Sequence, residues 1–236
     1  MKKSRYLFIL SLLLFVLMLC SCSQTQGISM DIYLQQYEHI VRMWAQSVEA
    51  GDGTAGIAFY GDSRVALADW YSAYPDYDVV NLGIGGDMVE QTLTRLSLLD
   101  AFEVKYCFLA IGGNNALSDS FDAASFRTNY DKLLTELENR DITVYVNTVA
   151  GITKAYASES KSNAGKNDKI KAVNTIITEL ATSHNITVID VASLLNDSDG
   201  FLKEEYSSDG VHFSDAGNKI WFDTLESYVA AANEAL

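Results

Sequence analysis

A serine stands where an apolar run meets a segment compatible with a helix. The segment IAFYGDSRV, at residues 57–65, changes from apolar to polar at Gly61-Asp62-Ser63. Gly, Asp and Ser are ordinary turn residues, so a strand-to-helix turn is one interpretation. A serine hydroxyl at such a point can also act as a nucleophile, provided that a base lies beside it. Whether Ser63 has this chemistry depends on the residues that accompany it.

Three histidines could supply the base. His39 lies in an N-terminal segment outside the repeating pattern of the chain, and His184 follows a helical segment, where a surface capping role is expected. His212 comes three residues after Asp209, so one turn could present both side chains. Asp209 would orient the imidazole, and His212 would accept the Ser63 proton; the order of the three along the chain is immaterial. Without a serine nucleophile, the segment from Asp209 to His212 would indicate only a turn before a helix.

Two further segments contain donors for a developing negative oxygen. Gly86, in NLGIGGD at 81–87, could offer its backbone N–H, because the missing Cβ permits close approach. Asn114, in GGNN at 112–115, could offer its side-chain amide. Together with the N–H of Ser63, these groups would form the oxyanion hole that acyl transfer requires. A tight turn and an Asx turn are the purely structural alternatives.

The elements that must position these residues alternate along the chain. Apolar runs predict strands at 57–60, 79–82, 104–111, 142–149 and 186–189. Helical spacing marks 30–50, 65–74, 89–99, 126–137, 170–180 and a segment from about 214, with loops at 150–163 and 191–208. Apolar strands separated by amphipathic helices predict an α/β fold, a three-layer α/β/α sandwich around a five-stranded parallel sheet. Ligands of such sheets bind beyond the carboxyl ends of the strands, where the candidate residues lie.

The composition excludes several classes of protein. The chain has 236 residues, of which 48% are hydrophobic, and this suits one globular domain. A formal net charge of −14 disfavours a nucleic-acid partner, which needs basic patches. The Walker and GxGxxG patterns and a zinc-ligand spacing are absent, so we expect no cofactor and no metal. Cys107, alone in an apolar run, is expected to be a buried strand cysteine.

Taken in order, the four polar segments resemble the sequence blocks of the SGNH hydrolases, a branch of the GDSL esterases and lipases. The likeness extends from about Gly56 to Leu225, and the matching residues are Ser63, Gly86, Asn114, and Asp209 with His212. NLGIGGD is similar to the second block of bacterial members and of the catalytic subunits of platelet-activating-factor acetylhydrolase. The resemblance implies a flavodoxin-like sandwich that hydrolyses carboxylic esters without a metal, through an acyl-enzyme on the serine.

Two residues depart from the pattern of that family. Asn115 stands where an aspartate usually follows the block-three asparagine. We expect this change to alter the support around Asn114 without removing the donor. Arg64 stands where many members have a small or apolar residue. It either contacts an acidic or sugar substrate or lies on the helix surface.

The expected function is therefore serine ester hydrolysis, with short-chain or acetyl esters of carbohydrate or lipid as substrates. One alternative is a non-catalytic surface lipoprotein that keeps the fold to bind glycan or peptide. Another is a metal-dependent phosphoesterase that uses Asp62, Asp87, Asp209 and His212. Acidic residues in the loop at 191–208 disfavour strongly anionic substrates. The sequence contains no motif that specifies acyl chain length or oligomeric state.

The N-terminal residues are typical of a secretory signal. Lys2, Lys3 and Arg5 precede an apolar run over residues 6–20, which is short for a permanent membrane span. Loss of these three positive charges by cleavage would take the formal net charge from −14 to −17. An electrostatic attraction to anionic lipid is therefore not expected, and a lipid group would have to hold the chain at a membrane.

The run ends in Leu19-Cys20-Ser21-Cys22, which resembles a bacterial lipobox. Cys22 fits the lipidated position better than Cys20, because Ser21 is small and Leu19 is not. A plain signal peptide cut nearby is the alternative.

These features predict three segments. Residues 1–21 are a lipoprotein signal peptide, residues 22–53 are a tether and N-terminal helix, and residues 54–236 are the SGNH hydrolase domain. The predicted location is extracytoplasmic, with the protein anchored to a membrane as a bacterial lipoprotein.

Overall fold

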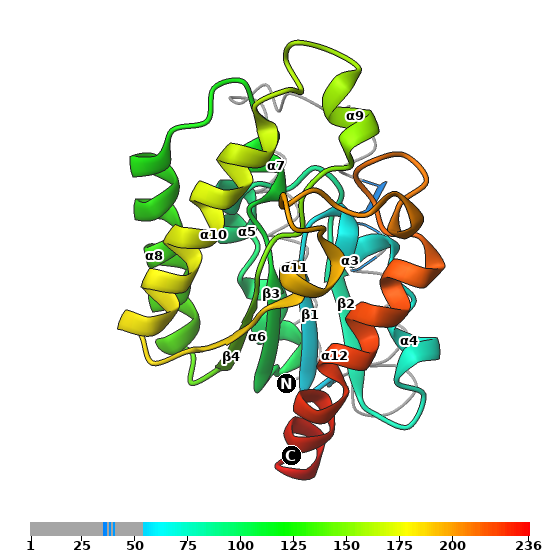
Figure 1. The fold of residues 1–236 in the computed structure, drawn as a ribbon. Helices are drawn as coiled ribbons and strands as arrows, with labels where there is room; N and C mark the ends of the chain where they lie inside the picture. The colour runs from blue at the N-terminus through cyan, green and yellow to red at the C-terminus, as the bar shows by residue number, and fades with distance from the viewer. Residues whose placement is uncertain (1–34, 37, 39, 41–53) are drawn as a thin grey trace.

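A computed structural model describes residues 35, 36, 38, 40 and 54–236 of the chain (Figure 1). The predictions for the signal peptide, for Cys22 and for His39 concern residues outside this part, as does most of the expected helix at 30–50. Within the described residues, no helix combines the length and the apolar character needed to cross a membrane.

Five parallel strands form one sheet in the order β2-β1-β3-β4-β5, as the alternating pattern predicts. They are β1 (Ile57–Gly61), β2 (Val79–Gly83), β3 (Tyr106–Ala110), β4 (Thr143–Asn147) and β5 (Thr187–Ile189). The last residue of β1, Gly61, is in register with Gly83 of β2 and with Ala110 of β3. The segments that follow these three strands therefore emerge together at one edge of the sheet, and the strand order reverses at β1, where such folds bind ligands.

Helices cover both faces of the sheet (Figure 1). Alternate strand residues point to opposite faces, so the buried side chains form two clusters. One cluster, which contains Cys107 as predicted, packs under α5 (Val89–Thr94), α6 (Ser97–Phe102), α8 (Ala123–Glu138) and α10 (Lys166–Ser183). The other packs under α3 (Ser63–Leu67), α4 (Trp70–Ala73), α11 (Val191–Leu195) and α12 (Asp215–Glu234). The structure is thus the predicted three-layer sandwich.

Short helices account for the differences from the sequence prediction. The helix expected at 65–74 is two helices, α3 and α4, because Asp69 caps a new helix by accepting from the N–H of Ser72 at 3.1 Å. The helix expected at 89–99 is likewise divided into α5 and α6. The loop expected at 150–163 contains α9 (Lys154–Ser158), and the loop expected at 191–208 contains α11 and a 3-10 turn at Glu204–Tyr206. α7 (Gly113–Leu117) follows β3 directly.

The short helix α3 rests directly on β2. The side-chain amide of Asn81 donates to the carbonyl oxygens of Val65 and Ala66, at 3.0 and 3.3 Å, near the end of α3. A Cβ added to Gly83 would lie 2.2 Å from the backbone nitrogen of Ala66. Only a glycine at this position lets α3 approach the strand so closely, and α3 carries Ser63.

Replacement of Gly83 by alanine tests this contact. The methyl group meets backbone atoms that cannot rotate away, so Gly83→Ala should lower the free energy of unfolding in urea by about 1–3 kcal/mol. Gly165→Ala is the matched control, because nothing lies within 4 Å of a Cβ added there. Its cost should stay within about 1 kcal/mol, the loss of a glycine N-cap. Equal unfolding midpoints for the two variants would contradict the close packing of α3.

Candidate active site

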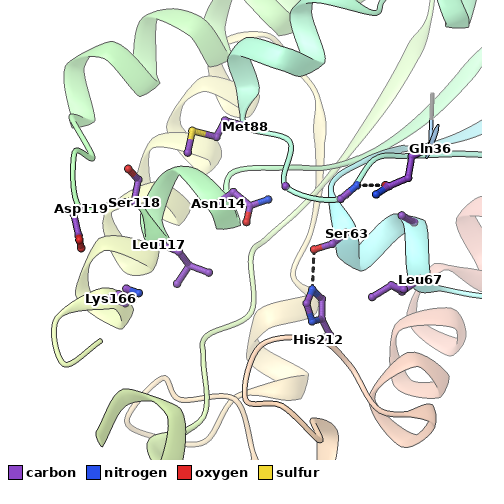
Figure 2. Close-up of a pocket in the computed structure, with 13 residues that line it drawn as sticks. Gln36, Ser63, Leu67, Met88, Asn114, Leu117, Ser118, Asp119, Lys166 and His212 are labelled. Carbon is purple, nitrogen blue, oxygen red and sulfur yellow. Dashed lines mark hydrogen bonds between the residues drawn. The ribbon is translucent and has the colours of Figure 1, made fainter. Parts of the chain in front are cut away.

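Ser63, His212 and Asp209 lie in one chain of hydrogen bonds. Ser63 is the first residue of α3, separated from the end of β1 by Asp62 alone, and its Oγ lies 2.9 Å from Nε2 of His212 (Figure 2). The Nδ1 of His212 lies 2.6 Å from Oδ2 of Asp209. These residues are thus brought together as the spacing of Asp209 and His212 predicts, with a 149-residue separation between serine and histidine.

The surroundings of Asp209 determine which nitrogen of the imidazole carries a proton. Partial burial by itself raises the pKa of Asp209, but the hydrogen bond from the His212 ring and those from the backbone N–H groups of His212 and Val211 lower that pKa to about 2. Both N–H groups donate to Oδ1, at 2.8 and 2.9 Å. An ionised carboxylate can only accept, so Nδ1 of His212 must donate. In the neutral ring, Nε2 then accepts from the Ser63 hydroxyl.

Three candidate donors belong to residues that line the same pocket. Asn114, in α7, donates one N–H of its side-chain amide to the carbonyl oxygen of Asp87 at 2.9 Å, which leaves the second N–H for a ligand. Gly86 has a φ of +79°, a backbone conformation that favours glycine. No acceptor for the backbone N–H of Gly86 or of Ser63 occurs among the described residues. Ser63, Gly86, Asn114 and His212 all line one pocket.

A buried arginine supports these donors from behind. Arg95 forms a salt bridge of 2.6 Å with Asp87, and both side chains are fully buried. The guanidinium also donates to the carbonyl oxygens of Leu82 and Gly61, at 2.7 and 2.8 Å, and lies over the ring of Tyr60. Burial raises the pKa of Asp87, and the charge and hydrogen bond of Arg95 oppose this effect.

Arg95 is a site residue that was not predicted, although the sequence contains a signal for it. In the segment that was expected to be one helix, Arg95 lies three residues after Thr92 and four before Leu99, on the face that is buried. A charged residue on the buried face of a helix indicates a buried ion pair, because an unpaired charge is too costly to bury. The partner, Asp87, follows from no pattern in the sequence.

Asn115, in the segment GGNN, makes hydrogen bonds to the first residues of α5. Its side-chain oxygen accepts from the backbone N–H of Val89 at 3.1 Å, and its amide nitrogen donates to Oε2 of Glu90 at 3.1 Å. Oε1 of Glu90 accepts from Asn129 at 2.8 Å. The amide in place of the usual aspartate therefore pairs with a carboxylate, which an aspartate could not do without proton uptake. Asn114 lines the pocket, and its role as a donor stays a prediction.

Arg64 occupies neither of the two positions that the sequence suggested. Its Nε donates to the carbonyl oxygen of Val211 at 3.0 Å, and its two terminal nitrogens donate to Ala150 and Gly151, at 2.8 and 3.0 Å. The guanidinium lies 4.7 Å from the centre of the Phe213 ring. Arg64 is not among the residues that line the pocket around Ser63. It therefore binds backbone groups of the protein, and is neither a surface residue of α3 nor directed at the pocket.

The pocket beside Ser63 has a volume of about 740 Å³. In Figure 2, Leu67 and Gln36 lie on one side of Ser63, and Met88, Leu117 and the polar residues at the far end lie on the other. Those polar residues are Ser118, Asp119 and Lys166. Gln36 comes from the N-terminal segment and accepts from the backbone N–H of Gly85 at 2.6 Å, a contact that no sequence signal indicated.

The structure does not support His184 as the base or the alternative of a metal-dependent phosphoesterase. His184 caps α10, as expected, and its ring nitrogens lie 2.8 and 3.0 Å from carboxylate oxygens of Asp131 and Glu138. Among the described residues, no group of three or more His, Cys, Asp or Glu side chains is placed to hold a metal ion. The proposed phosphoesterase ligands are therefore not gathered at one point, and the carboxylates of Asp62 and Asp87 have other contacts.

The chain matches the model of one protein family and the fold of several solved structures. Residues 34–220 match the model of the GDSL-like Lipase/Acylhydrolase family. A Streptococcus pneumonia protein described provisionally as a platelet activating factor has a TM-score of 0.69 and 24% identity, over 84% of this chain and 94% of its own. A Bacteroides fragilis protein described provisionally as an acylhydrolase has a TM-score of 0.67 and 18% identity, over 81% and 96%.

A catalytic mutant of an acetylxylan esterase from Geobacillus stearothermophilus has a TM-score of 0.60 and 16% identity, over 75% of this chain and 95% of its own. No curated protein matches the chain. At these identities the solved structures show the shared fold.

The hydrogen bond between the Asn115 amide and the Glu90 carboxylate can be tested by substitution. Asn115→Asp should keep the hydrogen bond from Val89 but place two carboxylates together, and so lower the free energy of unfolding by about 1–3 kcal/mol at pH 7. The deficit should shrink as the pH falls towards about 4, because one carboxyl then takes up a proton and donates. Adding Glu90→Gln should restore stability at pH 7, since its amide can face the new carboxylate while its oxygen still accepts from Asn129. A deficit that is independent of both pH and Glu90→Gln would contradict the pairing.

Proposed function

Because the chain belongs to the GDSL-like Lipase/Acylhydrolase family, we propose that it is a serine ester hydrolase that forms an acyl-enzyme on Ser63. The observation that carries this proposal is the chain of hydrogen bonds from Ser63 Oγ to His212, at 2.9 Å, and from His212 to Asp209, at 2.6 Å. Both distances lie within the reach that proton transfer between these groups requires. The serine hydroxyl faces a pocket that is large enough for a small ester.

The reaction begins when an ester carbonyl carbon lies beside Ser63 Oγ. Nε2 of His212 takes the hydroxyl proton as Oγ attacks, and the carbonyl oxygen becomes an oxyanion. The C–O bond to the alcohol then breaks, and the alcohol leaves with the proton from His212. Water attacks the acyl-enzyme in the same way, with His212 again as the base, and releases the acid. Asp209 stays ionised throughout and stabilises the imidazolium that forms twice in each cycle.

The oxyanion is held by the backbone N–H groups of Ser63 and Gly86 and by the free N–H of the Asn114 amide. Donors of this kind contribute most when their positions are set before the reaction, because no reorganisation is then needed. The links from Asn114 to Asp87, and from Asp87 to Arg95, supply that rigidity here. Removal of one such donor from a hydrolase typically costs about 10²–10³ in kcat.

The lining of the pocket supports a short acyl group joined to a polar alcohol. Ala66, Leu67, Met88 and Leu117 provide apolar walls near the serine, while the far end has hydroxyl, carboxylate and ammonium groups. Acetyl or short-chain esters of carbohydrate or lipid fit this division. The acetylxylan esterase of the same fold acts on one such substrate. A non-catalytic glycan- or peptide-binding lipoprotein would have no use for a serine that donates to an aspartate-bound histidine.

Replacement of Ser63 by alanine tests the assignment of the nucleophile. Ser63→Ala should lower kcat/KM by about 10³-fold or more on a panel of esters from acetyl to long-chain, including acetylated sugars. The wild-type protein should react covalently with a fluorophosphonate probe, and Ser63→Ala should not. Ser158→Ala, which changes an exposed serine of α9, is the control and should retain activity and labelling. A wild-type chain that neither reacts with the probe nor cleaves any ester would favour the binding-protein alternative.

We further propose that Cys22 is lipidated and anchors the enzyme outside the cytoplasm, at a membrane surface. The support for this comes from the sequence of the N-terminal segment. In cells grown with an alkyne-bearing fatty acid, the full-length chain should incorporate the label. Cys22→Ser should abolish the labelling, and Cys20→Ser should not. Label that is lost with Cys20→Ser alone would assign the lipid to that residue, and an unlabelled wild-type chain would indicate a plain signal peptide.

A further inference from the structure

Arg64 connects three segments that are distant in the sequence. It lies on α3, next to Ser63, and its guanidinium donates to Val211 in the segment that carries His212. Its other two nitrogens donate to Ala150 and Gly151, in the connection that follows β4. The accepting groups are all backbone carbonyls, which no change of side chain at those positions would remove.

Val211 and Phe213 pack against the two core clusters, but the segment around His212 has few other hydrogen bonds to the body of the protein. The carbonyl of Gly210 accepts from the N–H of Thr153 at 3.0 Å, and Ser207 pairs with Phe213 within the segment itself. The carboxylate of Asp209 does not connect the segment to the rest of the protein, because it accepts from the backbone N–H groups of Val211 and His212 within the same segment. Of the backbone groups of this segment, the Val211 carbonyl that Arg64 binds is the one directly before His212.

We propose that Arg64 is a positioning residue, which holds the His212 segment so that Nε2 lies within reach of Ser63 Oγ. The inference rests on the proposed function, because it assigns Arg64 a role in presenting the base to the nucleophile. Consecutive residues of a helix point about 100° apart. Ser63 can thus face the pocket while Arg64, on the same helix, binds the backbone beside the histidine. A shift of α3 carries both residues together and preserves the distance between serine and imidazole.

Arginine suits this role better than lysine does. Its planar guanidinium presents donors in fixed directions, and three of its nitrogens here reach three separate carbonyls. A lysine ammonium is a flexible point charge and would not match all three acceptors. The centre of the Phe213 ring lies 4.7 Å from the guanidinium and restricts the orientation of its plane. Burial lowers the pKa of Arg64, and the charges of Asp62 and Asp209 oppose this effect, so the group remains a cation.

The decisive experiment removes the three donors while keeping an unbranched side chain against Phe213. Arg64→Met should lower kcat by about 10²-fold, the typical cost of a misplacement by about 1 Å, with KM unchanged within about twofold. Arg64→Lys, which keeps the charge, should fall between Arg64→Met and the wild type. Arg127→Met is the matched control, because that arginine is exposed and, within the described part of the chain, its one ion pair is with Glu179 on the surface. It should leave both constants unchanged.

A second measurement reports on the histidine without any substrate. The proton between His212 Nδ1 and Asp209 should give a far-downfield NMR resonance, which is assigned by its absence in His212→Gln. In Arg64→Met this resonance should broaden or disappear, while circular dichroism shows a folded protein. Arg127→Met should retain it. If Arg64→Met does not fold, Arg64→Lys provides the same comparison.

Each outcome decides the proposal. A folded Arg64→Met with wild-type kcat and an unchanged resonance would overturn it. A raised KM with unchanged kcat would also overturn it, and would make Arg64 a substrate contact. Should the wild-type chain hydrolyse none of the esters while the resonance still depends on Arg64, the positioning role would stand and the proposed function would fail.

Discussion

The ion pair between Arg95 and Asp87 is the interaction on which the rest of the site depends. Burying both charges costs several kcal/mol per ion, and the geometry must return that free energy through close contacts. The contacts that oppose this cost are the salt bridge of 2.6 Å, two hydrogen bonds to carbonyls near the ends of β1 and β2, and the Tyr60 ring, whereas Oδ1 of Asp87 is buried without a partner among the described residues. The carbonyl of Asp87 in turn accepts from Asn114. Strand ends and oxyanion donor are therefore fixed relative to one another by a single buried pair.

Two arginines, Arg95 and Arg64, connect different segments of this site. Arg95 pairs with Asp87 beside the donors of the proposed oxyanion hole, whereas Arg64 binds the segment that carries His212. Arg64 belongs to α3, which is seated on β2 through Asn81 and Gly83. Each guanidinium uses its fixed directions to join backbone carbonyls from different segments. The side chains of the candidate site can consequently stand on short helices and loops and still keep a defined geometry.

Much of the fold was predictable because buried strands are almost entirely apolar. The run at 57–60, for example, became β1 with one added residue, Gly61. The long helices α8 and α10 were also indicated by their spacing, since their apolar stripes persist over several turns. Short helices such as α9 and α11 were missed, because five residues are too few to establish a period. Their capping residues, Thr153 and Asp190, were the available signals.

The sequence by itself determined which groups could do the chemistry, because those relations are local or follow from strand ends. Asp209 and His212 are three residues apart in one turn, and Ser63 closely follows a strand. Only the tertiary structure decided what surrounds them. Arg64 and the carbonyl of Val211 are 147 residues apart, and Arg95 and the carbonyl of Gly61 are 34 apart. Every residue has a backbone carbonyl, so the sequence contains no mark of the ones that an arginine will bind; the fold alone selects them.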